Sequence, residues 1–217
     1  MATTVQSLVL QLAQRVDPRT DDGTELTLAN IGTVSGSIFT AQRLLDIYNH
    51  ARITLLQALI LSHNKDDVVS LVGGTVKNEA ITWTSQSATI PTDLIEFVSM
   101  KNAAKVPMIL CPSSWMSDVE SGGNTDLVST ASNLLIFESG ANYIFLGTAS
   151  LVPNANTYRI RYIGLTNWAL SDVTTGTATE TIDVNLHPVL LELAQGIALE
   201  MGAVELNALA ARLLGGK

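Results

Sequence analysis

The chain is poor in the residues that build redox and thiolate-metal sites. It contains one cysteine, Cys111, among 217 residues. A single thiol excludes an internal disulfide framework and a zinc cluster built on thiolates, because both need several cysteines. Cys111 precedes Pro112 and has no histidine or basic residue beside it in the sequence, which indicates a buried inert thiol rather than a nucleophile.

Charged residues are also scarce, at 15% of the chain, whereas 47% of the residues are hydrophobic. A composition this apolar excludes general disorder. The net charge is -8, from 12 basic and 20 acidic residues, and no run of Lys or Arg stands out. An extended nucleic-acid ligand is therefore disfavoured, because neutralising phosphates requires clustered cations.

Long uninterrupted apolar runs are absent, so we expect no membrane span. The opening stretch MATTVQSLVLQLAQR lacks a basic region, and its apolar residues recur with a helical period. This pattern predicts a short helix from Thr3 to about Val16 rather than a signal peptide. We expect synthesis in the cytosol and a soluble product.

Two segments have the length and period of long helices. Apolar residues recur three and four apart over 40–61, and Thr40 or Ser37 can cap the first turn. The second segment, 186–214, has Pro188 in its first turn, where the missing N–H is tolerated. Helices of this length are not stable alone. We therefore predict that the two pack on each other.

The stretch between these helices consists of short β-rich runs separated by turn residues. The run TYRIRYI at 157–163 alternates, which places Arg159 and Arg161 on a solvated or partner-facing side. Ser139-Gly140 separates two apolar runs and is a weak hairpin signal.

The predicted fold class is α+β, with N- and C-terminal helices packed as a small bundle and an antiparallel β-rich domain inserted between them. The predicted helical core comprises 1–64 and 182–217. The predicted β-rich insertion is 65–181, within a single compact protein.

No catalytic or metal-binding constellation emerges from the sequence. His50, His63 and His187 are too far apart for a metal site on adjacent helical turns. Phosphate-loop, dinucleotide and nucleophile-elbow motifs are absent. The acidic turn from Asp17 to Glu25 departs from the calcium-loop pattern, because Arg19 stands where a ligand is required. We expect no enzymatic activity, no catalytic residue, no metal site and no cofactor.

The aromatic residues near the β-rich runs have two interpretations. They form interface anchors or carbohydrate platforms, or they fill the β core. The core interpretation is preferred because each residue sits beside an apolar run. The residues concerned are Trp83, Trp115, Trp168, Tyr158 and Tyr162.

Three stretches in chain order carry a family resemblance. The first is LAQRVDP followed by LLDIYNHARITLLQAL at 44–59, with Asn49 and Ala51 at its centre. The second is ATIPTDLIEFVSM at 88–100. The third combines YRIRYIGLTNWALSD with TIDVNLHPVLLELAQGIALEMG. Together they resemble the head-to-tail adaptor (connector, or neck-ring) proteins of tailed bacteriophages. The chain departs from the family at Gly164, where a proline usually follows the strand, and in a longer β-rich stretch at 106–151.

The resemblance implies a non-enzymatic virion structural protein. It implies a homo-oligomeric ring of about twelve subunits, each contributing two different faces. Such a ring sits under the portal protein, extends the DNA channel and offers an attachment platform for tail or nozzle proteins. DNA passes through its lumen without sequence-specific binding, and no membrane is involved. The implied location is the virion neck, at the head–tail interface, after synthesis in the host cytoplasm.

Two surfaces are candidate protein interfaces under this interpretation. The C-terminal segment 208–217 is predicted to dock on the portal as a helix in a groove. The hairpin at 134–146 is predicted to face the tail. The candidate interface residues are Leu206, Leu209, Arg212, Leu213, Leu214, Asn142, Tyr143, Arg159 and Arg161.

Other functions remain open at this point. The nearest alternative is another phage tail-completion or minor virion protein with a β-rich middle. A less favoured alternative is a glycan- or host-binding module that uses the aromatic residues. A cytosolic hydrolase would need a base and a nucleophile that the sequence does not offer.

Overall fold

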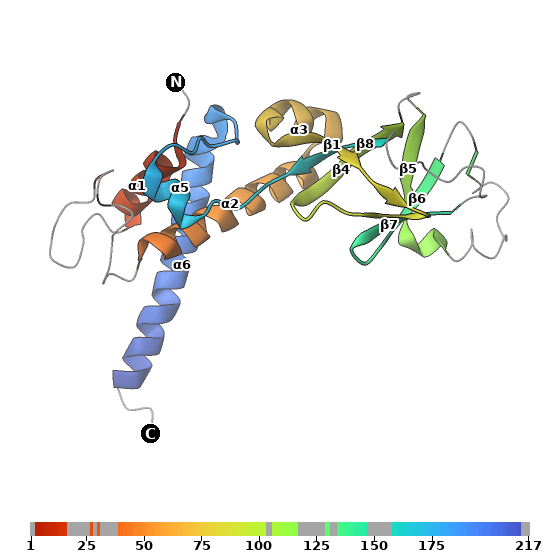
Figure 1. The fold of residues 1–217 in the computed structure, drawn as a ribbon. Helices are drawn as coiled ribbons and strands as arrows, with labels where there is room; N and C mark the ends of the chain where they lie inside the picture. Colours follow the sequence, from red (N-terminus) through yellow and green to blue (C-terminus); the bar gives the residue numbers. More distant parts are fainter. Residues whose placement is uncertain are drawn as a thin grey trace. The chain divides into compact units, whose positions relative to one another are not determined.

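The computed structural model describes residues 3–16, 27, 30, 39–102, 106–116, 129–130, 134–146 and 158–213. The chain divides into two compact units (Figure 1). Unit 1 combines 1–74 with 166–217, and unit 2 is 75–165. The segments 65–74 and 166–181, which the sequence placed in the β-rich insertion, belong to unit 1.

Unit 1 is helical, and the two ends of the chain build it together. Thr40 is the N-cap residue of α2 (Ala41–Ser62), and its side chain accepts a hydrogen bond from Arg43 N at 3.3 Å. Asn64 caps the next helix in the same way. The helical elements are α1 (Val5–Val16), α2 (Ala41–Ser62), α3 (Lys65–Leu71), the 3-10 turn η2 (Gly73–Thr75), α5 (Leu170–Thr175), the 3-10 turn η5 (Val184–Leu186) and α6 (His187–Leu213).

The start of the chain is tied to the segment that leads into α6. Thr4 forms an isolated antiparallel bridge with Thr179. Val5 N donates to Ala178 O at 2.9 Å, and Glu180 N donates to Thr3 O at 3.1 Å. These bonds hold α1 beside 178–180, so that residues far apart in sequence share one core.

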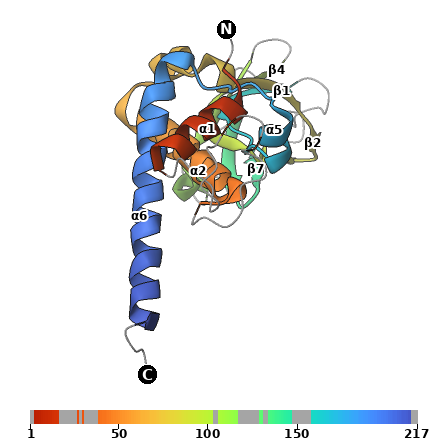
Figure 2. The same ribbon diagram turned by 90° about the vertical axis from the view of Figure 1, so that its left-hand side faces the viewer.

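α6 has one face covered by its own unit. Leu190, Leu191, Ala194 and Ala198 are buried on that face, and the helix contacts α1 and α2. The C-terminal part of the helix runs past the other helices of the unit (Figures 1 and 2). No helix in the described part of the chain combines the length and the apolar character needed to cross a membrane.

Unit 2 is built on one eight-stranded sheet with the order β1-β8-β4-β5-β6-β7-β3-β2. Antiparallel pairing connects most neighbours, but β5 and β6 are parallel. The two end strands are separated by one residue, Thr82, so the sheet curls round until it is nearly closed. The strands are β1 (Val76–Ile81), β2 (Trp83–Thr84), β3 (Ser87–Thr89), β4 (Leu94–Asn102), β5 (Pro107–Cys111), β6 (Leu134–Ser139), β7 (Asn142–Phe145) and β8 (Tyr158–Gly164). A 3-10 turn, η3 (Ser113–Trp115), follows β5.

The core of unit 2 lies on the concave side of this sheet. Alternation along β8 buries Tyr158, Ile160 and Tyr162 and exposes Arg159 and Arg161, as the sequence predicts for a half-buried strand. The expected hairpin joins β6 and β7, but its two turn residues are Gly140, at a φ of 59°, and Ala141, because Ser139 pairs with Asn142 within the strands. The residues buried with the β8 side chains are Ile81, Trp83, Ala88, Phe97, Met100, Met108, Leu134, Ile136, Tyr143 and Phe145.

The predicted fold class is wrong. The structure has a mostly β domain, whose single sheet is mixed and nearly closed, with helices at both ends of the chain and α3 in between. The sheet is not antiparallel because a long connection, 112–133, lets β6 return parallel to β5. The terminal helices do not form a clear small bundle, since α2 and α6 cross steeply in both views (Figures 1 and 2).

Candidate functional site: a buried polar network ahead of α6

α2 directs three polar side chains into the interior of unit 1. Tyr48 and Arg52 are 0% exposed and Asn49 is 7% exposed. Residues three and four apart share one face of a helix, so these side chains point to the same region. An arginine on a buried face needs a partner, because an unpaired charge in the interior is strongly destabilising.

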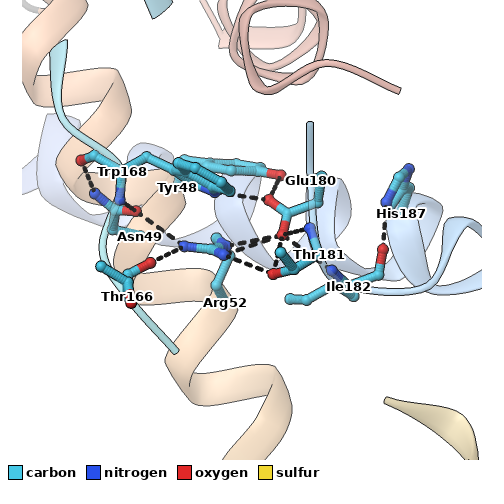
Figure 3. A network of polar contacts seen from close by, with 9 residues as sticks. All are labelled: Tyr48, Asn49, Arg52, Thr166, Trp168, Glu180, Thr181, Ile182 and His187. Carbon is cyan, nitrogen blue, oxygen red and sulfur yellow. Dashed lines mark hydrogen bonds and ion pairs between the residues drawn. The ribbon is translucent and has the colours of Figure 1, made fainter. Parts of the chain in front are cut away.

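That partner is Glu180, which precedes α6 (Figure 3). Its Oε1 accepts from Arg52 Nη2 at 3.0 Å and from Arg52 Nε at 3.2 Å. The same oxygen accepts from the backbone N–H groups of Thr181 at 2.7 Å and Ile182 at 3.0 Å. One carboxylate oxygen thus joins the middle of α2 to the turn that leads into α6.

The second carboxylate oxygen of Glu180 is also occupied. Oε2 accepts from Tyr48 Oη at 2.6 Å and from Trp168 Nε1 at 3.1 Å. The Arg52 guanidinium carbon lies 5.1 Å from the centroid of the Trp168 ring, within the range of a cation–π contact. The indole therefore touches both members of the ion pair (Figure 3).

The remaining Arg52 donors are directed to other oxygens. Nη1 donates to Thr166 O at 3.0 Å and lies 3.4 Å from Asn49 Oδ1. Nη2 lies 3.4 Å from Thr181 Oγ1. A guanidinium offers five N–H donors in a fixed fork, and this arrangement uses that fork in full.

The Asn49 side-chain amide forms hydrogen bonds with both the backbone N–H and the backbone C=O of Trp168. Its Nδ2 donates to Trp168 O at 2.9 Å, and its Oδ1 accepts from Trp168 N at 3.0 Å. The primary amide thus pairs with one residue's N–H and C=O as a neighbouring strand would. It fixes the extended chain that enters unit 1 after Leu165.

Electrostatics keep each member of the network in one protonation state. Burial alone would raise the pKa of Glu180, but the Arg52 charge, the Tyr48 hydroxyl and the two backbone donors hold that pKa below its ordinary value. Burial, followed by the negative charge of Glu180, raises the pKa of Tyr48 well above its ordinary value. Burial lowers the pKa of Arg52, and the charge of Glu180 opposes this shift. Glu180 is an anion and Tyr48 retains the proton it donates.

The network is chemically closed. Each of its carboxylate and guanidinium groups is engaged with the chain's own atoms, so none is directed to a substrate. His187 lies close by and its Nε2 is 2.9 Å from Ile182 O. Asp183 accepts from Asn185 N at 2.8 Å and caps η5. The arrangement therefore fixes where α6 begins, which is a positioning role rather than a catalytic one.

A second polar network lies in unit 2 and is partly exposed. Tyr162 Oη is 3.0 Å from Glu79 Oε2 and 3.0 Å from Asp93 Oδ1. The hydroxyl has one proton, so one carboxylate receives it at a time. Asp93 also pairs with Lys77, whose side chain is 32% exposed. Burial alone would raise the pKa of Asp93, but the bonds from Lys77 and Tyr162 hold it below its ordinary value.

This second network leaves no room for a side chain at Gly164. A Cβ atom at this position would lie 2.5 Å from Tyr162 Cε2 and 3.1 Å from Asp93 Oδ2. Any side chain there would displace the Tyr162 ring or the Asp93 carboxylate. Glycine is therefore required by the close approach of these two groups.

The candidate interface residues of unit 2 fall into two environments. Arg159 and Arg161 are exposed on β8. Asn142 is half-buried in β7. Tyr143 is 0% exposed and packs edge-on against Phe97, with ring centroids 5.9 Å apart, so its side chain belongs to the core.

The candidate interface residues near the C-terminus lie at the end of α6. The helix backbone continues to Leu213, and the side chains beyond Val204 lie outside the described residues. The residues concerned are Leu206, Leu209, Arg212, Leu213 and Leu214, of which Leu214 lies wholly outside the described part.

The remaining candidates for chemistry occupy ordinary positions. His50 and His63 are exposed on and just after α2, and Cys111 is 7% exposed, with burial raising the pKa of its thiol. The acidic turn from Asp17 to Glu25 lies outside the described residues. Among the residues that are described, no group of three or more metal-ligating side chains occurs.

The aromatic residues mainly fill cores. Trp83 is 3% exposed and Tyr158 is 6% exposed, and their rings meet edge-on with centroids 6.4 Å apart. Tyr162 is also in the core of unit 2. Trp168 belongs instead to unit 1, and Trp115 is 44% exposed.

Reading the sequence alone missed the Arg52–Glu180 pair. The signal for Arg52 was present, since the residue falls on the apolar side of its helix, four residues after Tyr48. A cation at such a position predicts a buried acidic partner. Glu180 gave no comparable signal, because it stands alone in a Thr-rich connection.

A scan against protein-family models found no match for the chain, and a search of curated proteins found none either.

Proposed function

We propose that the protein is a virion structural protein, a head-to-tail adaptor that forms a ring of about twelve subunits under the portal. In this function it extends the DNA channel and offers the platform to which tail components attach. It works in the virion neck, with the portal protein and tail or nozzle proteins as its partners.

The observation that carries the proposal is which parts of the sequence supply the polar network that precedes α6. Tyr48, Asn49 and Arg52 come from the first stretch that resembles the adaptors, whereas Trp168 and Glu180 come from or adjoin the third. Short motifs more than a hundred residues apart therefore meet in one hydrogen-bonded network. This network holds the segment that leads into the 27-residue helix α6.

The shape and charge of α6 support the same proposal. The helix runs past the rest of its unit (Figure 2), and it exposes Leu199 at 54% and Val204 at 64%. Apolar residues presented in this way mark a surface for association. The net charge of -8 suits a channel lining along which DNA slides, since clustered cations would hold the phosphates.

The aromatic residues give less support to a glycan-binding module. Carbohydrate platforms need exposed rings, but Trp83, Tyr143 and Tyr158 are buried in unit 2. Their burial favours the adaptor over this alternative.

The proposal is tested by binding to the immobilised cognate portal protein. The full chain is expected to bind, and a variant that lacks 209–217 is expected to retain its circular dichroism spectrum and lose binding, because the end of α6 is the proposed docking segment. A point-substituted control, Arg15→Glu on the exposed surface of α1, is expected to bind as the full chain does. No binding by the full chain would contradict the proposal, and unchanged binding by the shortened chain would contradict the role of α6.

A further inference from the structure

The solvent-facing side of α6 is one surface that the described part of the chain leaves uncovered. We define the α6 outer face as Val189, Glu192, Gly196, Leu199, Glu200 and Val204. Val189 is 48% exposed and Leu199 54%, away from the buried Leu190 and Ala194, and Val204 is 64% exposed further along the helix. The three apolar residues share this face with Glu192 and Glu200. The apolar residues of this face are therefore expected to meet a partner.

Gly196, in the middle of the α6 outer face, has no explanation within its own unit. Glycine in a helix interior is unfavourable relative to alanine. A Cβ atom added at Gly196 would meet nothing within 4 Å among the described residues. Internal packing therefore does not require glycine here. A residue without a side chain allows a second molecule to approach the helix closely.

The second uncovered surface is cationic and lies on unit 2. We define the cationic strip as Lys101, Arg159 and Arg161, which are exposed on the adjacent strands β4 and β8. Lys101 lies directly opposite Arg159 in the strand register. Like charges in this position are destabilising by themselves. Among the described residues, no carboxylate forms a salt bridge with any of the three.

An exposed apolar residue lies close to the cationic strip. Met100 pairs with Met108, and both point into the core. Ile109 follows Met108 on β5, faces the opposite side of the sheet, as Lys101 does, and is 43% exposed. Cations beside an apolar side chain thus complement a helix face that combines carboxylates with apolar side chains.

We propose that the cationic strip of one copy docks on the α6 outer face of the next copy. Charge complementarity identifies the partner. The cationic strip stands out on a chain of net charge -8, and Glu192 and Glu200 are exposed on the α6 outer face, with Arg43 of α2 beside Glu200. Two different faces meet, as a closed ring of identical subunits requires. The inference rests on the proposed function, which supplies the closed ring. It adds which residues of neighbouring copies are in contact.

Nucleic acid is another anionic partner that three exposed cations could bind. A few cations bind phosphates weakly, and a molecule of net charge -8 repels a polyanion at long range. A second copy supplies carboxylates and apolar contacts together. The cationic strip is therefore assigned to protein rather than to DNA, and DNA retention is an outcome of the test below.

The test is self-association measured by sedimentation equilibrium at low and high salt. The wild-type chain is expected to associate, with a dissociation constant that rises at high salt as charge pairs are screened. The variant R159E/R161E and the variant E192K/E200K are each expected to associate at least about tenfold more weakly, because like charges then face each other. An equimolar mixture of the two is expected to associate again, since each reversed face then meets its opposite.

Two further variants separate docking from folding. Gly196→Leu is expected to keep the thermal midpoint of the wild type, because the space around Gly196 is open, and to weaken association. Arg15→Glu reverses an exposed charge on α1 outside both surfaces and is expected to associate as the wild type does.

Several results would overturn the inference. A wild-type chain that stays monomeric at all concentrations, a mixture that fails to restore association, or reversed variants that associate normally would each contradict it. Salt-sensitive retention of duplex DNA that R159E/R161E abolishes, without any change in association, would assign the strip to nucleic acid. Portal binding is measured separately: association without portal binding contradicts the proposed function alone, and portal binding without charge-dependent association contradicts this inference alone.

Discussion

The two polar networks of the molecule use the same chemistry in different surroundings. In unit 1, Tyr48, Arg52 and Glu180 are buried, and the Arg52 and Glu180 side chains are 0% exposed. In unit 2, Tyr162, Lys77 and Asp93 form a similar set, with Lys77 32% and Asp93 19% exposed. Each set joins a tyrosine hydroxyl, a carboxylate and a cation from distant parts of the chain.

The difference lies in what each network would lose if one member were removed. A buried ion pair that loses one partner leaves a charge without water, at a cost of about 3–5 kcal/mol. A partly exposed pair is solvated when it breaks and is worth about 1 kcal/mol or less. The unit 1 network is therefore expected to contribute strongly to the stability of the segment before α6, and the unit 2 network to contribute little.

The largest expected effect comes from Arg52→Met in unit 1. The methionine fills the space but leaves Glu180 buried without its cation, so unit 1 is expected to lose about 3–5 kcal/mol of stability. Chemical denaturation followed by amide hydrogen exchange, read separately for peptides of the two units, measures the loss. The matched control is Arg159→Met on the exposed face of β8, which is expected to change stability by less than about 0.5 kcal/mol. Equal effects of the two substitutions would remove the proposed difference between the networks.

Acid is expected to weaken unit 1 through Glu180. The folded-state pKa of Glu180 is held below the value of about 4.3 for an unperturbed glutamate, so its contribution is present above that pH and is lost as the pH falls through the lower, folded value. Hydrogen exchange of unit 1 measured between neutral and acidic pH is expected to show this loss. Glu180→Gln is expected to be less stable at neutral pH and to lack this part of the pH dependence. An identical pH profile in the two proteins would contradict the assigned role of the carboxylate.

Tyr48→Phe removes one hydrogen bond to the buried carboxylate. The Tyr48 hydroxyl donates to Glu180 Oε2 at 2.6 Å, and a bond to a charged group contributes about 1.5–3 kcal/mol. Denaturation of unit 1 is expected to shift by that amount. A neutral result would show that water replaces the hydroxyl at this position.

The same substitution at Tyr143 is expected to have the opposite sign. The Tyr143 hydroxyl is buried, and among the described residues it has no hydrogen-bond partner. Removing an unsatisfied buried hydroxyl recovers its desolvation cost, so Tyr143→Phe is expected to stabilise unit 2 by about 1 kcal/mol. Thermal unfolding of the two phenylalanine variants side by side provides the comparison. Destabilisation by Tyr143→Phe would reveal a partner for the hydroxyl.

The smallest effect is expected for Lys77→Met in the unit 2 network. The pair with Asp93 is partly solvated, so its loss is expected to cost less than about 1 kcal/mol and to diminish at high salt. Denaturation at low and high salt measures both quantities. A loss as large as that of Arg52→Met would place the two networks in the same class.

The elements of the fold that depend on local periodicity could be predicted from the sequence. The helix over 40–61 is observed as α2, the helix over 186–214 as α6, and the alternating run at 157–163 as β8. Each has a period that one face of the element imposes on its side chains. The start of the predicted β-rich insertion instead forms α3 and a 3-10 turn.

The pairing of the strands could not be predicted in the same way. Strand order depends on contacts between residues far apart in the chain, and local patterns do not record them. The parallel pairing of β5 and β6 is such a case, because the local pattern of each strand is the same for either direction of its neighbour. Only half of the network in unit 1 could be predicted. Arg52 interrupts an apolar helix face and so indicates a buried partner, whereas nothing in the sequence around Glu180 identifies it as that partner.

The adaptor proposal is tested most directly by the mass of the purified protein, alone and mixed with the cognate portal, from light scattering after gel filtration. The proposal predicts a complex whose added mass corresponds to a ring of about twelve copies on each portal. A stable monomer that elutes apart from the portal would contradict it.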